Sequence, residues 1–184
     1  MGCHYSKESL SKNEMDFLRG HTKYDDDTIK KWHKNFRQDC PTGKLTPVQF
    51  VQMYKTFFPI KNPEQFCHHV FRVTDTDGNG YIDFKEFLLS VNVVCDGTAE
   101  EKLKWAFRIY DVDGNGVIQQ EEMTKMAESV YGVLSAADKK PNDMAEEGAK
   151  NTFVRFDLNS DGYITEEEFI KGCLQDNTLT KLLL

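Results

Sequence analysis

Three segments of twelve residues repeat nearly the same pattern along this chain of 184 residues. They are DTDGNGYIDFKE from Asp75, DVDGNGVIQQEE from Asp111 and DLNSDGYITEEE from Asp157. In each segment, side chains with oxygen atoms occupy positions 1, 3 and 5, glycine occupies position 6 and glutamate occupies position 12. An internal repeat constrains the architecture more than any other feature of a sequence. This one demands a sharp turn that gathers oxygen atoms, so it limits both the fold and the chemistry.

The spacing is that of the EF-hand, a helix–loop–helix unit whose loop wraps a calcium ion. Calcium takes about six to eight oxygen ligands, including a backbone carbonyl at position 7 and both oxygens of the glutamate at position 12. A single acidic, glycine-rich loop is often a solvated turn, but three complete matches in register exclude that reading. Magnesium could occupy some sites at rest. The predicted ligands are Asp75, Asp77, Asn79, Tyr81, Asp83, Glu86, Asp111, Asp113, Asn115, Val117, Gln119, Glu122, Asp157, Asn159, Asp161, Tyr163, Thr165 and Glu168.

A fourth segment, QDCPTGKLTPVQ, has the turn glycine, Gly43, but almost none of the ligands. Position 1 is Gln38, position 3 is Cys40 and position 12 is Gln49. The cysteine sulfur is a soft ligand that calcium does not favour, and glutamine cannot replace the bidentate carboxylate. We therefore predict that this first loop binds no calcium.

The residues around the loops predict amphipathic helices. Leu103, Ala106, Phe107 and Tyr110 lie at the i, i+3, i+4, i+7 spacing of one helix face before the third loop. Position 8 is aliphatic in every loop, and this residue can join two loops in a short antiparallel strand pair. We predict an all-α fold of four EF-hands in two paired lobes, with short β-bridges between the paired loops.

Composition excludes several classes of function. Lysine and arginine number 23 against 30 aspartate and glutamate residues, so the net charge of −7 disfavours binding along a nucleic-acid backbone. Five cysteines without CxxC spacing indicate a reducing compartment. We find no apolar run of roughly 20 residues, no signal peptide and no Walker, GxSxG or HExxH motif. The expectation is a soluble cytoplasmic protein that is not an enzyme.

Four hands with a disabled first loop that contains CPTG resemble the neuronal calcium sensor family, which includes recoverin, neurocalcin, visinin-like proteins and frequenin. The resemblance spans the whole chain, and its most specific segments are DCPTGKLT, KLKWAFRIYDVDGNG and MGCHYS. Frequenin-like members bind calcium at the second, third and fourth hands, whereas recoverin-like members lose the fourth, which this chain keeps. The resemblance implies a calcium sensor with three sites that regulates membrane-associated targets.

The N-terminal sequence MGCHYS fits the pattern for myristoylation of Gly2 after removal of Met1. One myristoyl chain binds membranes only marginally, so a second signal is needed. Basic residues of the arm or palmitoylation of Cys3 could supply it, although an unmodified thiol and a solvated basic face are equally open. The resemblance implies a calcium–myristoyl switch in which the lobes turn about Gly43 and Gly97. The protein would then attach reversibly to the inner face of membranes.

The resemblance also implies a hydrophobic groove for an amphipathic helix of a target, which could be a kinase, a cyclase, an ion channel or a lipid kinase. Several aromatic residues around the disabled hand are candidates for this groove, although some of them belong to the core. A homodimer is also possible. The groove candidates are Trp32, Phe36, Phe50, Met53, Tyr54, Phe57, Phe58 and Phe84.

Two other functions remain open, namely a calcium buffer and a constitutive EF-hand regulatory subunit of an enzyme or channel. A buffer needs neither an acylated terminus nor a groove. The predicted division of the chain is an N-terminal acylated arm at 1–19, an N-terminal lobe at 20–95, a hinge at 96–97, a C-terminal lobe at 98–175 and a C-terminal tail at 176–184.

Overall fold

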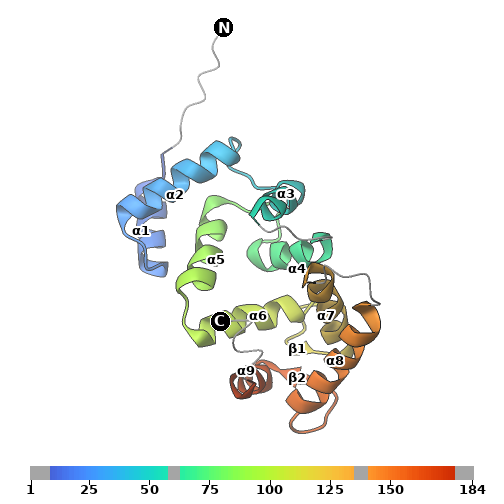
Figure 1. Cartoon of the computed structure of the whole chain (residues 1–184). Helices are drawn as coiled ribbons and strands as arrows, with labels where there is room; N and C mark the ends of the chain where they lie inside the picture. The colour runs from blue at the N-terminus through green and yellow to red at the C-terminus, as the bar shows by residue number, and fades with distance from the viewer. Residues whose placement is uncertain (1–8, 58–62, 135–140, 177–184) are drawn as a thin grey trace.

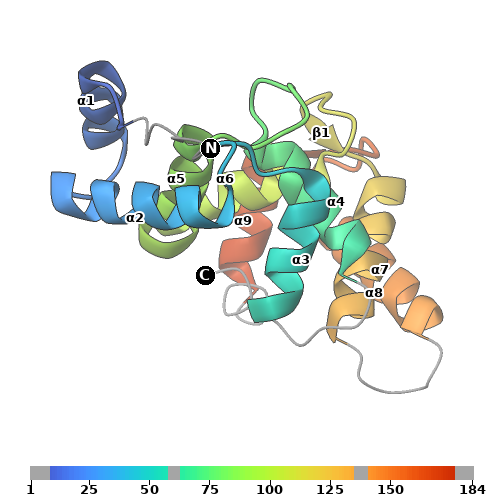
Figure 2. The ribbon, with the colours of Figure 1, turned by 90° about the horizontal axis from the view of Figure 1, so that it is seen from above.

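The computed structural model describes residues 9–57, 63–134 and 141–176, and it confirms the predicted all-α fold with EF-hands in two lobes. Figure 1 shows the N-terminal lobe (α1 to α5) above the C-terminal lobe (α6 to α9), and Figure 2 shows the same elements from above. The described elements are α1 (Lys12–His21), α2 (Asp26–Asp39), α3 (Pro47–Phe57), α4 (Glu64–Thr74), α5 (Phe84–Asp96), α6 (Ala99–Tyr110), β1 (Val117–Ile118), α7 (Gln120–Leu134), α8 (Pro141–Phe156), β2 (Ile164–Thr165) and α9 (Glu166–Gln175).

Capping residues explain where several helices begin. Thr98 and Glu101 form a capping box at the start of α6, in which the Thr98 N–H donates to Glu101 Oε2 at 2.7 Å. The loops use the same device, because positions 9 and 12 of the second loop, Asp83 and Glu86, form the capping box of α5. Such a box satisfies backbone donors that the first turn of a helix leaves free. The last residues of the second loop therefore also cap the helix that follows the loop.

Short β-bridges join the loops in pairs, as predicted. Leu45 and Ile82 exchange backbone hydrogen bonds of 2.9 Å in both directions. In the C-terminal lobe, β1 pairs antiparallel with β2, with Ile118 opposite Ile164. All four side chains are buried. The aliphatic residue at position 8 therefore links the two loops of a lobe and anchors both in the core.

The N-terminal lobe begins earlier than residue 20. Leu18 of α1 is fully buried in the core of this lobe, and α1 packs against α2 and α5. Lys23, which follows α1, donates from its ammonium group to the backbone carbonyl of Asp96 at the end of α5. The segment expected to be an arm thus includes a packed helix, while residues 1–8 lie outside the described residues.

The predicted hinge lies where α5 ends. Asp96 is the last residue of α5, and the Gly97 N–H donates to the Val93 carbonyl at 3.0 Å. A Cβ atom on Gly97 would lie 2.3 Å from that carbonyl oxygen, so no other residue fits without movement of the backbone. Gly43, the second predicted hinge residue, has a φ of 75°, a value that glycine tolerates best. Rotation about these two residues stays a prediction.

Within the described part of the chain, no helix is both long enough and apolar enough to cross a membrane.

Candidate calcium sites

The second loop gathers three of its four predicted acidic ligands. Carboxylate oxygens of Asp75, Asp77 and Glu86 lie within 4.8 Å of one another. The loop backbone holds them, since the Gly80 N–H donates to Asp75 Oδ2 at 2.9 Å. Glu86 is only 3% exposed and accepts from the backbone N–H of Thr76 at 2.8 Å. A carboxylate this deeply buried requires compensating partners, and a divalent cation would be the strongest of them.

The third loop repeats this geometry. Carboxylate oxygens of Asp111, Asp113 and Glu122 also lie within 4.8 Å of one another, and Asp111 and Glu122 are buried. The Gly116 N–H donates to Asp111 Oδ2 at 3.0 Å, and the Val112 N–H donates to Glu122 Oε1 at 2.8 Å. The position-12 glutamate is therefore held across the loop in the same way in both lobes.

The fourth loop has the same network with an amide in place of one acid. The Gly162 N–H donates to Asp157 Oδ2 at 3.0 Å, and the Thr165 N–H donates to Glu168 Oε2 at 3.0 Å. Asn159 stands at position 3 and Asp161 at position 5, so this loop has three carboxylates, as the third loop has, in a different order. Hydrogen bonds from Thr165 lower the pKa of Glu168, which keeps this ligand ionised.

The first loop keeps the turn but lacks the ligands. Gln49 Oε1 accepts from the Thr46 N–H at 3.0 Å just before α3 begins. The position-12 glutamate of the second loop makes the same kind of bond, since Glu86 Oε2 accepts from the Asp83 N–H before α5. No carboxylate stands at position 1, 3 or 12. Cys40 is 3% exposed, and burial raises the pKa of its thiol, so the thiolate that binds metal ions is disfavoured.

The groove candidates fall into two groups in the structure. Phe36, Phe50 and Phe84 are buried in the core of the N-terminal lobe. Trp32, Met53 and Tyr54 are partly buried and pack against that core, the side chain of Phe57 is not among those described, and Phe58 lies outside the described residues.

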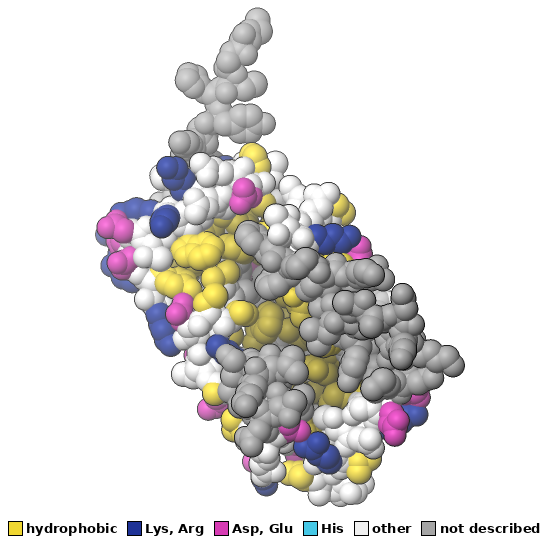
Figure 3. Space-filling view, viewed as in Figure 1, with side chains coloured by type: hydrophobic (Ala, Val, Ile, Leu, Met, Phe, Trp, Pro, Cys, Tyr) yellow, Lys and Arg dark blue, Asp and Glu magenta, His cyan; other side chains and the backbone are white. Residues whose placement is uncertain are grey.

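Hydrophobic side chains gather in the middle of the face seen in Figure 3, over α5 and α6. Aromatic contacts connect the half-buried candidates to two rings outside the predicted groove. The rings of Trp32 and Phe87 lie 5.9 Å apart, and those of Tyr54 and Phe66 lie 5.8 Å apart. An apolar pocket of about 210 Å³ between α4, α5, α6 and α7 includes Phe66 and Trp105. The i, i+3, i+4 spacing of apolar residues in these helices is the sequence signal that could have added Phe66, Phe87 and Trp105 to the groove candidates.

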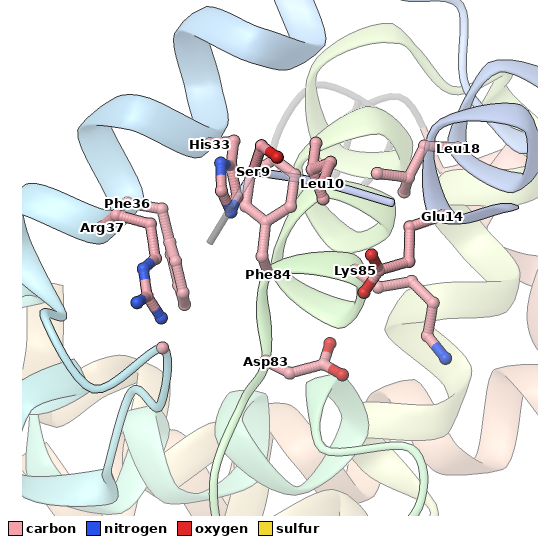
Figure 4. A pocket seen from close by; sticks show the side chains of 11 residues that line it. Ser9, Leu10, Glu14, Leu18, His33, Phe36, Arg37, Asp83, Phe84 and Lys85 are labelled. Carbon is pink, nitrogen blue, oxygen red and sulfur yellow. The ribbon is translucent and has the colours of Figure 1, made fainter. Parts of the chain in front are cut away.

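A second pocket of about 370 Å³ lies beside the disabled loop and is lined by α1, α2 and the start of α5. Figure 4 shows Phe36 and Arg37 on one side of it and Glu14 on the other. Burial and the nearby charge of Arg37 lower the pKa of His33, which also lines this pocket. Basic and acidic side chains therefore share this pocket, which differs from the apolar pocket between the lobes.

Comparison with known proteins agrees with this geometry. Residues 42–92 and residues 100–174 each match a family described as an EF-hand domain pair. The chain is 42% identical to neuronal calcium sensor 1 of Lymnaea stagnalis over 185 aligned residues, which cover all of this chain and 96% of that protein. It is 35% identical to human recoverin over 95% of this chain and 90% of recoverin. It is 34% identical to S-modulin of Aquarana catesbeiana over 95% of this chain and 89% of that protein.

Full-length relatives at this identity establish the family. The paired EF-hand loops, the clustered carboxylates and these relatives all point to calcium sensing and not to enzyme catalysis. The chain therefore belongs to the neuronal calcium sensor family.

Proposed function

We propose that this sensor binds calcium at its second, third and fourth loops, through the eighteen ligands predicted from the sequence, and not at its first. The observation that carries this proposal is the convergence of Asp75, Asp77 and Glu86 and of Asp111, Asp113 and Glu122. The matching backbone hydrogen bonds of the fourth loop support a third site. A loop that already directs its oxygens inward loses little conformational freedom when it binds an ion.

Calcium then exposes a hydrophobic surface that holds an amphipathic helix of a membrane-associated target. In sensor EF-hands, ion binding changes the angle between the helices that flank the loop. Trp32, Met53 and Tyr54 lie at the edge of the core, where such a movement would uncover them. A target helix with apolar residues on one face would fit this surface.

The N-terminus adds reversible attachment to membranes. Gly2 and Cys3 lie outside the described residues, so this part rests on the sequence pattern MGCHYS and on the family. A single myristoyl chain gives weak binding, which allows the protein to exchange between the cytoplasm and the inner face of a membrane. Calcium would control this exchange by moving the acyl chain.

Two measurements test the sensor against the buffer. Isothermal titration calorimetry of metal-free protein is expected to show about three calcium ions per chain. Binding of an environment-sensitive dye is expected to rise with calcium, because sensors expose apolar surface and buffers barely open. Heat of binding without any rise in dye binding would identify a buffer. A partner that stays bound in chelator would identify a constitutive subunit.

Sedimentation with anionic vesicles tests the membrane part. Protein produced with an N-myristoyltransferase is expected to pellet with the vesicles in calcium and to be released in chelator. The Gly2→Ala variant cannot be acylated and is expected to stay in the supernatant in both conditions. Equal pelleting of the variant and the acylated protein would show that the acyl chain plays no part.

A further inference from the structure

Two arginines donate hydrogen bonds to backbone carbonyls across the boundary between the lobes. Arg72 of α4 donates from Nη2 to the carbonyls of Arg108 and Ile109 at 2.8 and 3.2 Å. Arg108 of α6 donates from its Nη2 to the carbonyl of Val73 at 3.2 Å. We call Arg72 and Arg108 the arginine pair. Because α4 enters the second loop and α6 enters the third, the pair connects two calcium loops that belong to different lobes.

The accepting carbonyls lie in the last turns of these two helices. Carbonyls there have no partner within their own helix, and cations near a helix C-terminus complement its dipole. Val73 precedes Asp75 by two residues, and Ile109 precedes Asp111 by two. Each entering helix is thus capped by an arginine from the other lobe, directly before the first calcium ligand.

Electrostatics link Arg72 to the third loop. Burial, together with the like charge of Arg108, lowers the pKa of Arg72, while the charges of Asp111, Glu122 and Asp113 act in the opposite direction and stabilise the guanidinium cation. Its Nε atom is buried and has no hydrogen-bond partner among the described residues. A calcium ion in the third loop would bind the same carboxylates. Arg72 and that ion therefore compete for the same negative charge.

We propose that the arginine pair couples the second loop to the third, so that calcium at one makes calcium at the other bind more tightly. Asp75 is both the C-cap of α4 and the first ligand of the second loop, so an ion there acts on the end of α4. Movement of α4 draws Arg72 away from α6 and from the third loop, which removes a competitor of the third ion. Linkage requires the reverse effect to be equally large.

The inference rests on the proposed calcium binding. The fluorescence of a single tryptophan can report calcium binding at the third loop. The chain has two tryptophans, and Trp32→Phe leaves only Trp105, which lies on α6. The fluorescence of Trp105 is titrated with calcium, once with the second loop intact and once with Glu86→Gln. The Glu122→Gln variant must abolish the signal that is assigned to the third loop.

For each variant, we take the ratio of the calcium midpoint measured with Glu86→Gln to the midpoint measured with the second loop intact. A direct effect of the lost arginine charge on the third loop changes both midpoints equally, so it cancels in this ratio. We expect the intact second loop to lower the midpoint by about fivefold or more in the Trp32→Phe parent. In Arg72→Met this ratio is expected to fall below about twofold. Lys125→Met is the matched control, since Lys125 of α7 lines a pocket of about 510 Å³ together with Arg72 and its loss is expected to leave the ratio unchanged.

The outcomes separate this inference from the proposed function. If the parent shows neither calorimetric heat nor a fluorescence change with calcium, the proposed function itself is wrong. If calcium binds but the parent ratio is near one, or if Arg72→Met keeps the parent ratio, the coupling is wrong and calcium binding stands. Circular dichroism checks folding. Should Arg72→Met not fold, Arg108→Met removes the reciprocal bond from the other helix and is judged by the same ratio.

Discussion

The glutamate at position 12 has two functions in each calcium loop. In the second loop, Glu86 Oε1 accepts from the Thr76 N–H on the far side of the loop, and Glu86 Oε2 accepts from the Asp83 N–H at the start of α5. Gln49 of the first loop keeps only the second function, through the Thr46 N–H. An uncharged side chain therefore suffices to start the helix, while closure of the loop around an ion requires the carboxylate.

This division of roles predicts the effect of exchanging the two side chains. Glu122→Gln is expected to reduce the number of calcium ions bound per chain from about three to about two, because one bidentate ligand is lost. Gln49→Glu is the converse change and is expected to add no ion, since Gln38 and Cys40 still lack carboxylates. Calorimetric stoichiometry measures both. Binding of an additional ion by Gln49→Glu would show that position 12 alone disabled the first loop.

Burial divides the described cysteines by reactivity. Cys95 is exposed, whereas Cys40, Cys67 and Cys173 are buried. Burial raises the pKa of Cys67 to about 11 and that of Cys173 to about 12, so their thiolate fractions at neutral pH are very small.

Alkylation with iodoacetamide at pH 7.5, followed by peptide mapping, is expected to modify Cys95 at least about tenfold faster than Cys67 or Cys173. Peptide mapping distinguishes Cys3 from this group. Equal rates for Cys95 and Cys67 in the folded protein would contradict the packing of α4 described here.

The disabled first loop supports the second loop, which is its partner in the N-terminal lobe. Leu45 and Ile82 join the backbones of the first and second loops through a two-way β-bridge, and the Leu45 side chain is 3% exposed. The helix–loop–helix of the first hand is thus retained as a scaffold for the second.

Leu45→Ala is therefore expected to weaken calcium binding at the second loop, although Leu45 lies outside that loop. The cavity should also lower the free energy of unfolding by about 2 to 5 kcal/mol. Val48→Ala is the matched control, because Val48 lies in the first turn of α3, three residues after Leu45, and is 67% exposed. Calorimetry in a Glu122→Gln, Glu168→Gln background isolates the second loop. An unchanged affinity in that background would mean that the two loops act independently.

The elements that the sequence predicted correctly are those set by local spacing. The loops and the bridges at position 8 each depend on residues at fixed short offsets. The burial of Leu18 could not be predicted, because it depends on contacts of α1 with α5 that are distant in sequence. The bond from Arg72 to the Arg108 carbonyl joins residues 36 apart, and the bond from Arg108 to the Val73 carbonyl joins residues 35 apart, so no local pattern could predict either.

The two lobes share part of one core. Ile109 of α6 and Met126 of α7 belong to the C-terminal lobe, yet both pack in the cluster of buried residues that forms the core of the N-terminal lobe. The remaining buried residues of α6 and α9, such as Phe107 and Phe169, form a separate cluster. A division into two lobes at 96–97 follows the repeat but not the packing, because α4 rests on α6 and α7.

The shared packing predicts cooperative unfolding. In calcium-free buffer, differential scanning calorimetry of the protein is expected to show one transition, since unfolding of either lobe exposes the core of the other. Met126→Ala is expected to lower the free energy of unfolding by about 2 to 5 kcal/mol, because Met126 is fully buried. Loss of this contact between the lobes is expected to split the transition into two. Leu174→Ala on α9 is the control, since Leu174 is 53% exposed and its loss should leave one transition. Two separate transitions in the unmodified protein would show that the lobes unfold independently, and the arginine pair would then have no rigid boundary through which to act.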